Sequence, residues 1–242
     1  MSEPRFGPAP EAPKRFYAEA SVIETESGFA LALDGRTAKT PARAPLAAPT
    51  RALGEAVAAE WAAQGERIEH LAMPLTRLLM TAIDRGAPDA GAWRELIVSF
   101  LKSDLLCYRA ESPADLVERQ TGTWTPYLGA FRARYGAGLA LAEGVIAVTQ
   151  PDEALDAVRA RLEDLDAFAL IAAKAATEIS GSAVLGLAAT LDGHDGDAVF
   201  AASRLDERFQ AEQWGVDVEA AAREAGLERD FLAAARFAED LK

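Results

Sequence analysis

Residues 99–127 read SFLKSDLLCYRAESPADLVERQTGTWTPY, and the pattern of the chain changes across this stretch. Before it, short apolar runs alternate with turn residues, which is typical of strands, and after it the apolar spacing is helical almost to the end. Within it, Leu105 and Leu106 are adjacent and interrupt the helical period. We therefore expect the chain to cross here from a β-containing part to a helical part.

Helices are expected on both sides of this crossing. Upstream, apolar residues from Trp93 to Leu101 share one face of a helix that Asp89 can cap, so Trp93 is a predicted core residue. Downstream, Ser112-Pro113 and Thr125-Pro126 each place a hydroxyl before a proline, a pattern that begins helices. Two helices are therefore predicted, running to about Gln120 and to about Tyr135.

The N-terminal part is predicted to be a small α+β domain over residues 15–85. Turn signals at Ser27-Gly28 and Asp34-Gly35 separate three short apolar runs, which favours a three-stranded antiparallel meander. Helices over 50–64 and 74–84 should cover this sheet, with Trp61 in the core. Gly65 is expected as the left-handed residue that ends the first helix, and Gly86 as the end of the second.

The remaining boundaries follow from composition and spacing. Residues 1–14 carry four prolines and no apolar period, so we expect a disordered arm. Residues 86–148 should form a helical connection, in which 139–148 is open between a strand and a connecting segment. Residues 149–242 should form an all-α bundle with a helix break at Gly181. Its last helices are expected over 198–214, 217–225 and 228–241. The predicted class is α+β, with a helix-covered N-terminal β-meander followed by a helical bundle.

Composition narrows the range of functions. The chain has 242 residues and a net charge of −13, with no cluster of Lys and Arg, which argues against a nucleic-acid partner. Its apolar runs are shorter than the ~20 residues that span a bilayer, so membrane insertion is not expected. No signal peptide or presequence is recognisable, and Cys107 is the only cysteine, so we expect a cytoplasmic protein without a disulfide.

The sequence contains no recognisable catalytic motif. Phosphate-binding loops, the G-x-S-x-G elbow, H-E-x-x-H and paired cysteines do not occur, and neither His70 nor His194 neighbours a nucleophile in a motif. We therefore assign no catalytic, metal-binding or cofactor-binding residue. A hydrolase that uses carboxylates alone leaves no signature in sequence, so this alternative stays open.

One helix departs from a simple core pattern. On the expected helix 198–214, one face is apolar and includes Phe209, a predicted structural residue. The other face carries Phe200, Ser203, Glu207, Gln210 and Trp214. An acid and an amide between two aromatic residues fit either a solvated face or a contact stripe for another protein, since interface anchors often combine these groups. Spacing alone does not choose between them.

The spacing Glu207-x-x-Gln210-x-x-x-Trp214-Gly215 resembles the C-terminal signature of the ATP-twelve family of assembly chaperones. Other segments that are similar to this family occur in order between about residues 16 and 219. They are Leu33-Asp34-Gly35-Arg36 with Thr40-Pro41, Glu60-Trp61-x-x-Gln64, Met73-Pro74-Leu75-Thr76, Thr81-Ala82-Ile83-Asp84, Ser103-Asp104-Leu105-Leu106-Cys107-Tyr108-Arg109, Gln120 with Trp124 and Pro126, and Gly181-Ser182.

The resemblance implies a chaperone that holds the free α subunit of the catalytic head of F-type ATP synthase before it pairs with β. It also implies no catalysis and no cofactor, and a bacterial member of the family, which we expect to be a monomer. Glu207 would be the residue most directly tied to function, with Gln210, Trp214, Phe200 and Ser203 as further partner-binding residues. The alternatives are another protein-binding module on the same fold and the carboxylate-only hydrolase.

Overall fold

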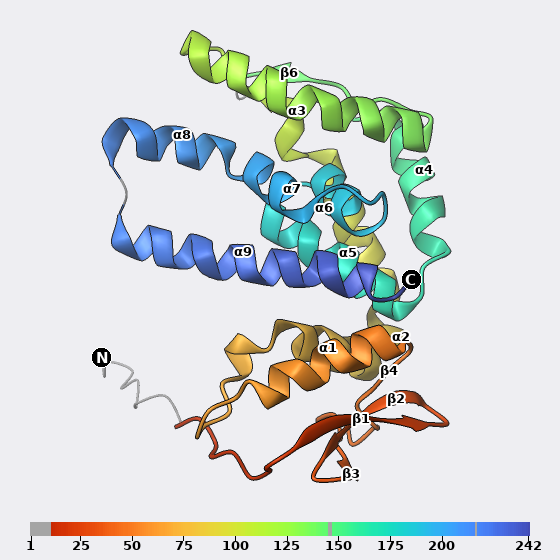
Figure 1. Cartoon of the computed structure of the whole chain (residues 1–242). Helices are drawn as coiled ribbons and strands as arrows, with labels where there is room; N and C mark the ends of the chain where they lie inside the picture. The colour runs from red at the N-terminus through yellow and green to blue at the C-terminus, as the bar shows by residue number, and fades with distance from the viewer. Residues whose placement is uncertain (1–10, 145–146, 216) are drawn as a thin grey trace, which may run out of the picture.

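The computed structural model describes residues 11–144, 147–215 and 217–242. A small sheet lies at one end of the molecule, and α1 and α2 lie between it and a helical bundle (Figure 1). The strands are β1 (Ala20–Thr25), β2 (Gly28–Leu33), β3 (Arg36–Thr37), β4 (Ala47–Ala48), β5 (Tyr108–Arg109) and β6 (Ala142–Glu143). The helices are α1 (Arg51–Ala62), α2 (Pro74–Lys102), α3 (Ala114–Tyr135), α4 (Asp152–Glu163), α5 (Ala167–Ser180), α6 (Ala183–Thr190), α7 (Gly196–Ser203), α8 (Leu205–Trp214) and α9 (Val218–Glu239), with short 3-10 helices at His70–Ala72 and Leu105–Cys107.

The predicted antiparallel meander is present. β1 pairs with β2 along its length, from Ala20 opposite Leu33 to Thr25 opposite Gly28, and β3 continues the meander on the other edge of β2. β4 also pairs with β2, an addition that its two alanines do not signal in the sequence. The α+β class predicted from the sequence is therefore confirmed.

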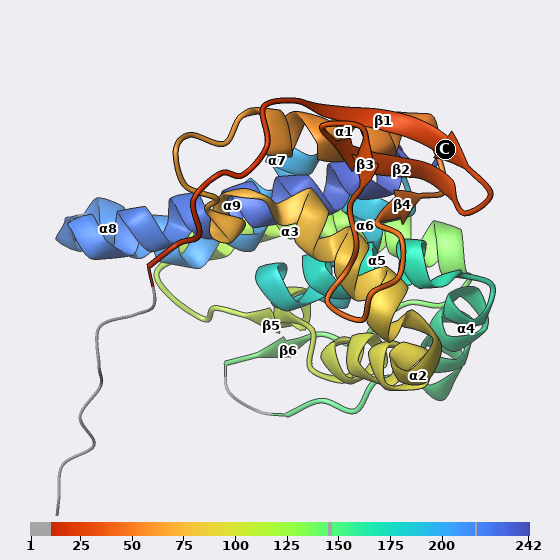
Figure 2. The same cartoon turned by 90° about the horizontal axis from the view of Figure 1, so that it is seen from below.

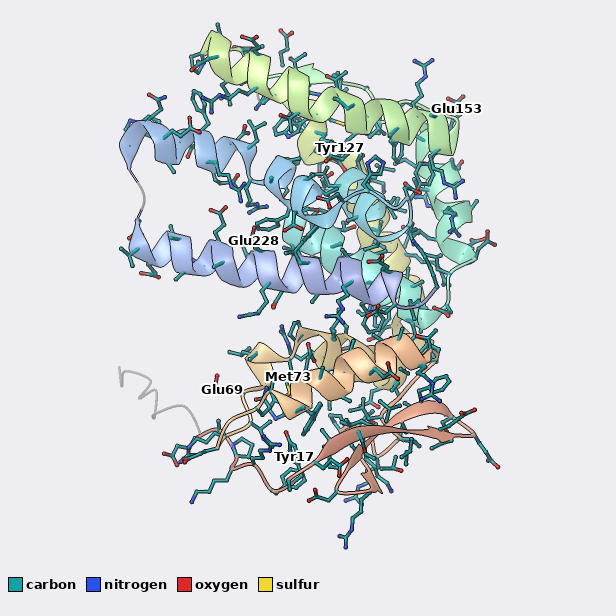
Figure 3. The ribbon with its side chains drawn as sticks, viewed as in Figure 1. Tyr17, Glu69, Met73, Tyr127, Glu153 and Glu228 are labelled. Atoms are coloured by element: carbon teal, nitrogen blue, oxygen red, sulfur yellow. The ribbon has the colours of Figure 1, made fainter. Side chains whose placement is uncertain are left out.

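Helix α1 covers the sheet and contributes Trp61 to the core. The Trp61 side chain is 6% exposed, and its ring packs 5.6 Å from that of Tyr17, whose hydroxyl donates a 2.7 Å hydrogen bond to the Trp61 carbonyl (Figure 3). The helix is capped at Thr50 and ends at Ala63, which has a right-handed conformation. The expectation that Gly65 is a left-handed cap is therefore wrong.

Helix α2 is one continuous helix of 29 residues, so two predicted boundaries are wrong. Gly86 does not end a helix, and Asp89 does not cap one but pairs with Arg85 at 2.7 Å. A Cβ at position 86 would lie 2.3 Å from the Cβ of Ala167, so this glycine lets α5 approach α2 closely. The boundary expected at residues 85 and 86 thus falls inside a helix, while Trp93 is buried as expected.

Helix α3 is likewise continuous where two helices were expected. Its N-cap residue is Pro113, and Pro126 lies within it rather than at the start of a second helix. Trp124 is fully buried and its indole donates a 2.9 Å hydrogen bond to the carbonyl of Ala202. This hydrogen bond joins α3 to α7, the helix that contains Ala202.

The bundle is built around α5, which packs against α2, α6 and α9. Gly181 has a φ of +71° and ends α5, so the break predicted there is confirmed. Helices α5 and α6 approach closely, because a Cβ at Gly186 would lie 2.4 Å from the hydroxyl of Thr177. The two helices expected over 217–225 and 228–241 form the single helix α9, with Gly226 inside it.

Backbone pairing holds the last residues of the predicted N-terminal arm and part of the segment 139–148. Of the expected arm, residues 1–10 lie outside the described residues, but Lys14 bridges to Arg67, and the amide of Ile68 donates a 2.8 Å hydrogen bond to the carbonyl of Pro13. Part of the open segment 139–148 is the strand β6, which pairs in parallel with β5. None of the helices in the described ranges has the length and apolarity needed to cross a membrane.

Candidate partner-binding surface

The single helix expected over 198–214 is two helices, α7 and α8, with a break at Arg204. The Ser203 hydroxyl donates to the Phe200 carbonyl at 2.7 Å, and the Arg204 amide bonds the carbonyl of Ala201 in a tight turn. The Arg204 guanidinium donates a 3.1 Å hydrogen bond to the Ile179 carbonyl at the end of α5. This long-range contact holds the turn and redirects α8.

The break divides the predicted contact stripe. Phe200 and Ser203 lie in the core, where the Phe200 ring packs 5.6 Å from that of Phe231. The prediction that Phe200 and Ser203 contact a partner is therefore wrong, because both side chains are buried. They lie on α7, before the break at Arg204, whereas Glu207 lies after it on α8. Glu207, Gln210 and Trp214 remain exposed together on α8.

Helix α8 extends outward from the core of the bundle, with the first turns of α9 beside it (Figure 1), and it is seen again at one side of the molecule in Figure 2. Its first turn is attached to α3 by a 2.8 Å hydrogen bond from the Gln120 amide to Asp206. Further out, Arg119 pairs with Glu212 at 2.8 Å, and its guanidinium lies 5.2 Å above the ring of Phe209. Phe209 is 6% exposed, so it anchors the helix as a structural residue, as predicted.

The exposed face of α8 contributes little to the fold. The Glu207 side chain is 57% exposed and lies 3.4 Å from Arg204, an arrangement typical of weak surface ion pairs. Trp214 is 82% exposed, although tryptophan is highly buried on average. Among the described residues, the side chains of Gln210 and Trp214 have no hydrogen-bond partner. This face therefore offers a large aromatic ring and two polar groups to another molecule.

A groove of about 690 Å³ lies on the other side of α8, against α3. Tyr127 of α3 lies at one end, where its ring is 5.5 Å from that of His194 (Figure 3). Burial raises the pKa of the Tyr127 hydroxyl above its usual value, and nearby Asp195 adds to this shift. The apolar wall of the groove includes Leu205 and Phe209. Sequence reasoning missed the contribution of α3, which the spacing of Gln120, Trp124 and Pro126 on one helix could have indicated.

Two acids of the other motifs, Glu60 and Asp84, hold distant segments together. The Glu60 carboxylate accepts 2.8 Å hydrogen bonds from the amides of Leu75 and Thr76 at the start of α2. Asp84 accepts a 2.6 Å hydrogen bond from the Thr40 hydroxyl. These two acids satisfy backbone and hydroxyl donors within the fold, whereas the motif residues Glu207, Gln210 and Trp214 on α8 are exposed.

A metal cluster and the single thiol are two kinds of group that could support catalysis. Within the described ranges, no three His, Cys, Asp or Glu side chains are placed to hold a metal ion. Cys107 is buried, and burial, followed by the nearby Asp104, raises the pKa of its thiol to about 12. The thiol is therefore protonated at neutral pH, as is typical of a buried structural cysteine.

Comparison with known proteins identifies similar chains. The family model described as ATP12 chaperone protein matches residues 14–132. The crystal structure of Atp12 from Paracoccus denitrificans is 38% identical with a TM-score of 0.87, and the match covers 95% of this chain and 99% of that one. A variant of that protein with one aspartate replaced by lysine matches at 37% identity and a TM-score of 0.87, covering 95% and 98%. A candidate chaperone from Agrobacterium tumefaciens is 43% identical with a TM-score of 0.90, covering 95% of this chain and 87% of that one.

Proposed function

The chain belongs to the ATP12 chaperone family, and from this premise we propose that it binds the free α subunit of the catalytic head of F-type ATP synthase and holds it until it pairs with β. The family supports a role as a chaperone in ATP synthase assembly. The α subunit as the target rests on the similarity of the motifs on α8 to the family signature. The role needs no chemical step and no cofactor, and we place it in the cytoplasm, with the chaperone acting as a monomer.

The observation that carries this proposal is the exposed face of α8. Trp214, Gln210 and Glu207 share that face and contribute little to folding. A tryptophan beside hydrogen-bonding groups is a common arrangement at binding hot spots. Burial of the Trp214 side chain against a partner would contribute about 2 to 3 kcal/mol from the apolar surface removed from water.

Binding of purified subunits tests the proposal. The chain is immobilised and exposed separately to the free α subunit, the free β subunit and the assembled catalytic head from the same cell. We expect saturable binding of free α, and much weaker binding of β and of the assembled head, in which α is already paired. Binding of β in preference to α, or no saturable binding of α, would overturn the assignment of the target.

A further inference from the structure

A second groove, of about 670 Å³, separates α8 from the first turns of α9. The two helices lie side by side: α8 runs outward from the bundle and α9 runs back toward it (Figure 1). An ion pair of 2.9 Å between Arg208 and Glu224 joins them at the inner end, and Gly215 and Asp217 line the groove at the outer end. The groove therefore has a wall on each helix, and its volume is within the range of ligand-binding pockets.

The apolar part of the walls consists of one tryptophan and several alanines. Ala211 and Trp214 line the groove from α8, and Ala220 and Ala221 line it from α9. Trp214 is 82% exposed, and Ala220 and Ala221 are also exposed. Small side chains opposite one large ring leave room for an inserted apolar side chain.

The rim of the groove is acidic. Residues 204–228 contain seven carboxylates, three arginines and no lysine. Arg208, the one cation among the described lining residues, is paired with Glu224. Glu207, Glu212 and Asp217 also line the groove, and the arginines that pair with Glu207 and Glu212 lie outside it. The charge that faces an occupant is therefore negative.

We propose that this groove, which we name the α8–α9 groove, binds a segment of the partner that carries an apolar side chain flanked by lysine or arginine. The apolar side chain packs against Trp214 and Ala221, and the flanking cations meet the carboxylates of the rim, because complementary charges set the orientation of a partner. This inference rests on the proposed function, since it describes the part of the α subunit that is bound.

Two matched substitutions on one helix test the groove. Ala221→Arg places a long cationic side chain inside it, whereas Ala222→Arg makes the same change at the next residue, which is exposed and does not line the groove. Alanine and arginine are both good helix formers, and the two variants have the same net charge, so they differ in position alone. Thermal unfolding of both variants confirms that each is folded.

The probes are three fluorescent peptides of equal length, in which Leu alternates with Lys, Leu with Glu, or Ser with Lys. We expect the Leu/Lys peptide to bind the full chain and the other two to bind at least ~10-fold more weakly, a difference of about 1.4 kcal/mol. Ala221→Arg should weaken binding of the Leu/Lys peptide by the same factor, and Ala222→Arg should leave its affinity unchanged. Added salt should also weaken binding of the Leu/Lys peptide to the parent chain, because the charges on the rim of the groove are exposed.

The free α subunit is then titrated with the same two variants. If α binds the parent chain and Ala222→Arg but not Ala221→Arg, the groove is the binding site. If Ala221→Arg binds α and the Leu/Lys peptide normally, the groove inference is wrong while the proposed function stands. If the peptides behave as expected but α does not bind the parent chain, the α target is wrong and the groove inference stands. Preference for the Leu/Glu peptide, or a dimer of the parent that Ala221→Arg dissociates, would overturn the stated chemistry of the occupant.

Discussion

The carboxylate of Asp104 accepts a 2.7 Å hydrogen bond from the hydroxyl of Ser182, 78 residues later in the chain. The same fully buried carboxylate accepts hydrogen bonds from the amides of Val184 at 3.0 Å and Leu106 at 3.1 Å. It therefore joins the segment after α2 to the start of α6. Two motifs that are far apart in the sequence thus meet at one buried acid.

Removal of this carboxylate should destabilise the whole bundle. Asp104→Ala leaves three buried donors without an acceptor, and we expect the free energy of unfolding to fall by about 3 kcal/mol or more. Ser182→Ala removes the N-cap of α6, which should cost about 1 kcal/mol. Urea unfolding of both variants shows which substitution lowers the free energy of unfolding more. A larger decrease for Ser182→Ala would show that Asp104 is not the centre of this hydrogen-bond network.

The same acid predicts a pH dependence of stability. Burial raises the pKa of Asp104 to about 6, although its hydrogen bonds with Ser182, Val184 and Leu106 oppose the shift. A raised pKa in the folded state means that Asp104 adds stability when protonated, and that this contribution is lost as the pH rises from about 4 to about 6. Compared with Asp104→Asn, which does not titrate, the parent should gain about 2 kcal/mol between pH 7 and pH 4.5. Unfolding curves of both proteins at the two pH values measure this gain, and parallel pH profiles would contradict it.

Two tryptophans should respond in opposite ways to the same change. Trp61 is 6% exposed, so Trp61→Arg should place an unpaired charge in the core, and truncation to Ala alone should cost ~3 to 5 kcal/mol. Trp214 is 82% exposed, so Trp214→Arg should change stability by less than ~0.5 kcal/mol. Melting temperatures of the two variants make the comparison. A Trp61→Arg protein that melts with the parent would refute its role in the core.

Reversal of charge at Glu207 should impair binding without unfolding the protein. Its side chain is 57% exposed, so Glu207→Lys should melt close to the parent, while a like-charge contact with a donor on the α subunit should cost several kcal/mol of binding free energy. Glu26→Lys, an equal charge change in the exposed turn between β1 and β2, is the matched control. If both variants bind α as the parent does, Glu207 lies outside the contact surface.

Phe209 should show the reverse behaviour. Because its ring is buried under Arg119, Phe209→Ala should lower the free energy of unfolding by ~3 kcal/mol or more. The affinity of the folded fraction for α should change little. Binding isotherms corrected for the folded fraction decide this point, and an intrinsic loss of affinity as large as that of Glu207→Lys would place Phe209 in the contact surface.

Local patterns predicted several elements correctly. The turn signals at Ser27-Gly28 and Asp34-Gly35 identified the meander, because these residues favour the backbone conformations of tight turns. The break at Gly181 was predicted for the same reason, since a glycine adopts a positive φ at little cost. Helical spacing placed Trp61, Trp93 and Phe209 in the core.

For the candidate site, the sequence predicts five residues on one face, and the structure places three of them together on the exposed side of α8. Glu207, Gln210 and Trp214 were assigned to one face from their spacing, and they share an exposed face of α8. Phe200 and Ser203 were assigned to the same face, since a periodic pattern does not reveal a turn between two helices. The opposite walls, α3 for one groove and α9 for the other, come from distant segments, and no pattern within residues 198–214 indicates which segments these are.

The sequence by itself thus determined the α+β class, the meander and the exposed acid, amide and tryptophan of α8, because these depend on turn chemistry and on periodicity within one element. The tertiary structure decided where helices continue and where they break. Helix α2 continues through Gly86 because α5 packs closely against that glycine. The expected long helix breaks at Arg204, whose guanidinium bonds the carbonyl of Ile179 at the end of α5. A glycine inside a helix costs about 1 kcal/mol relative to alanine. The packing contacts and hydrogen bonds with distant segments together contribute more free energy than this, so they decide where a helix continues.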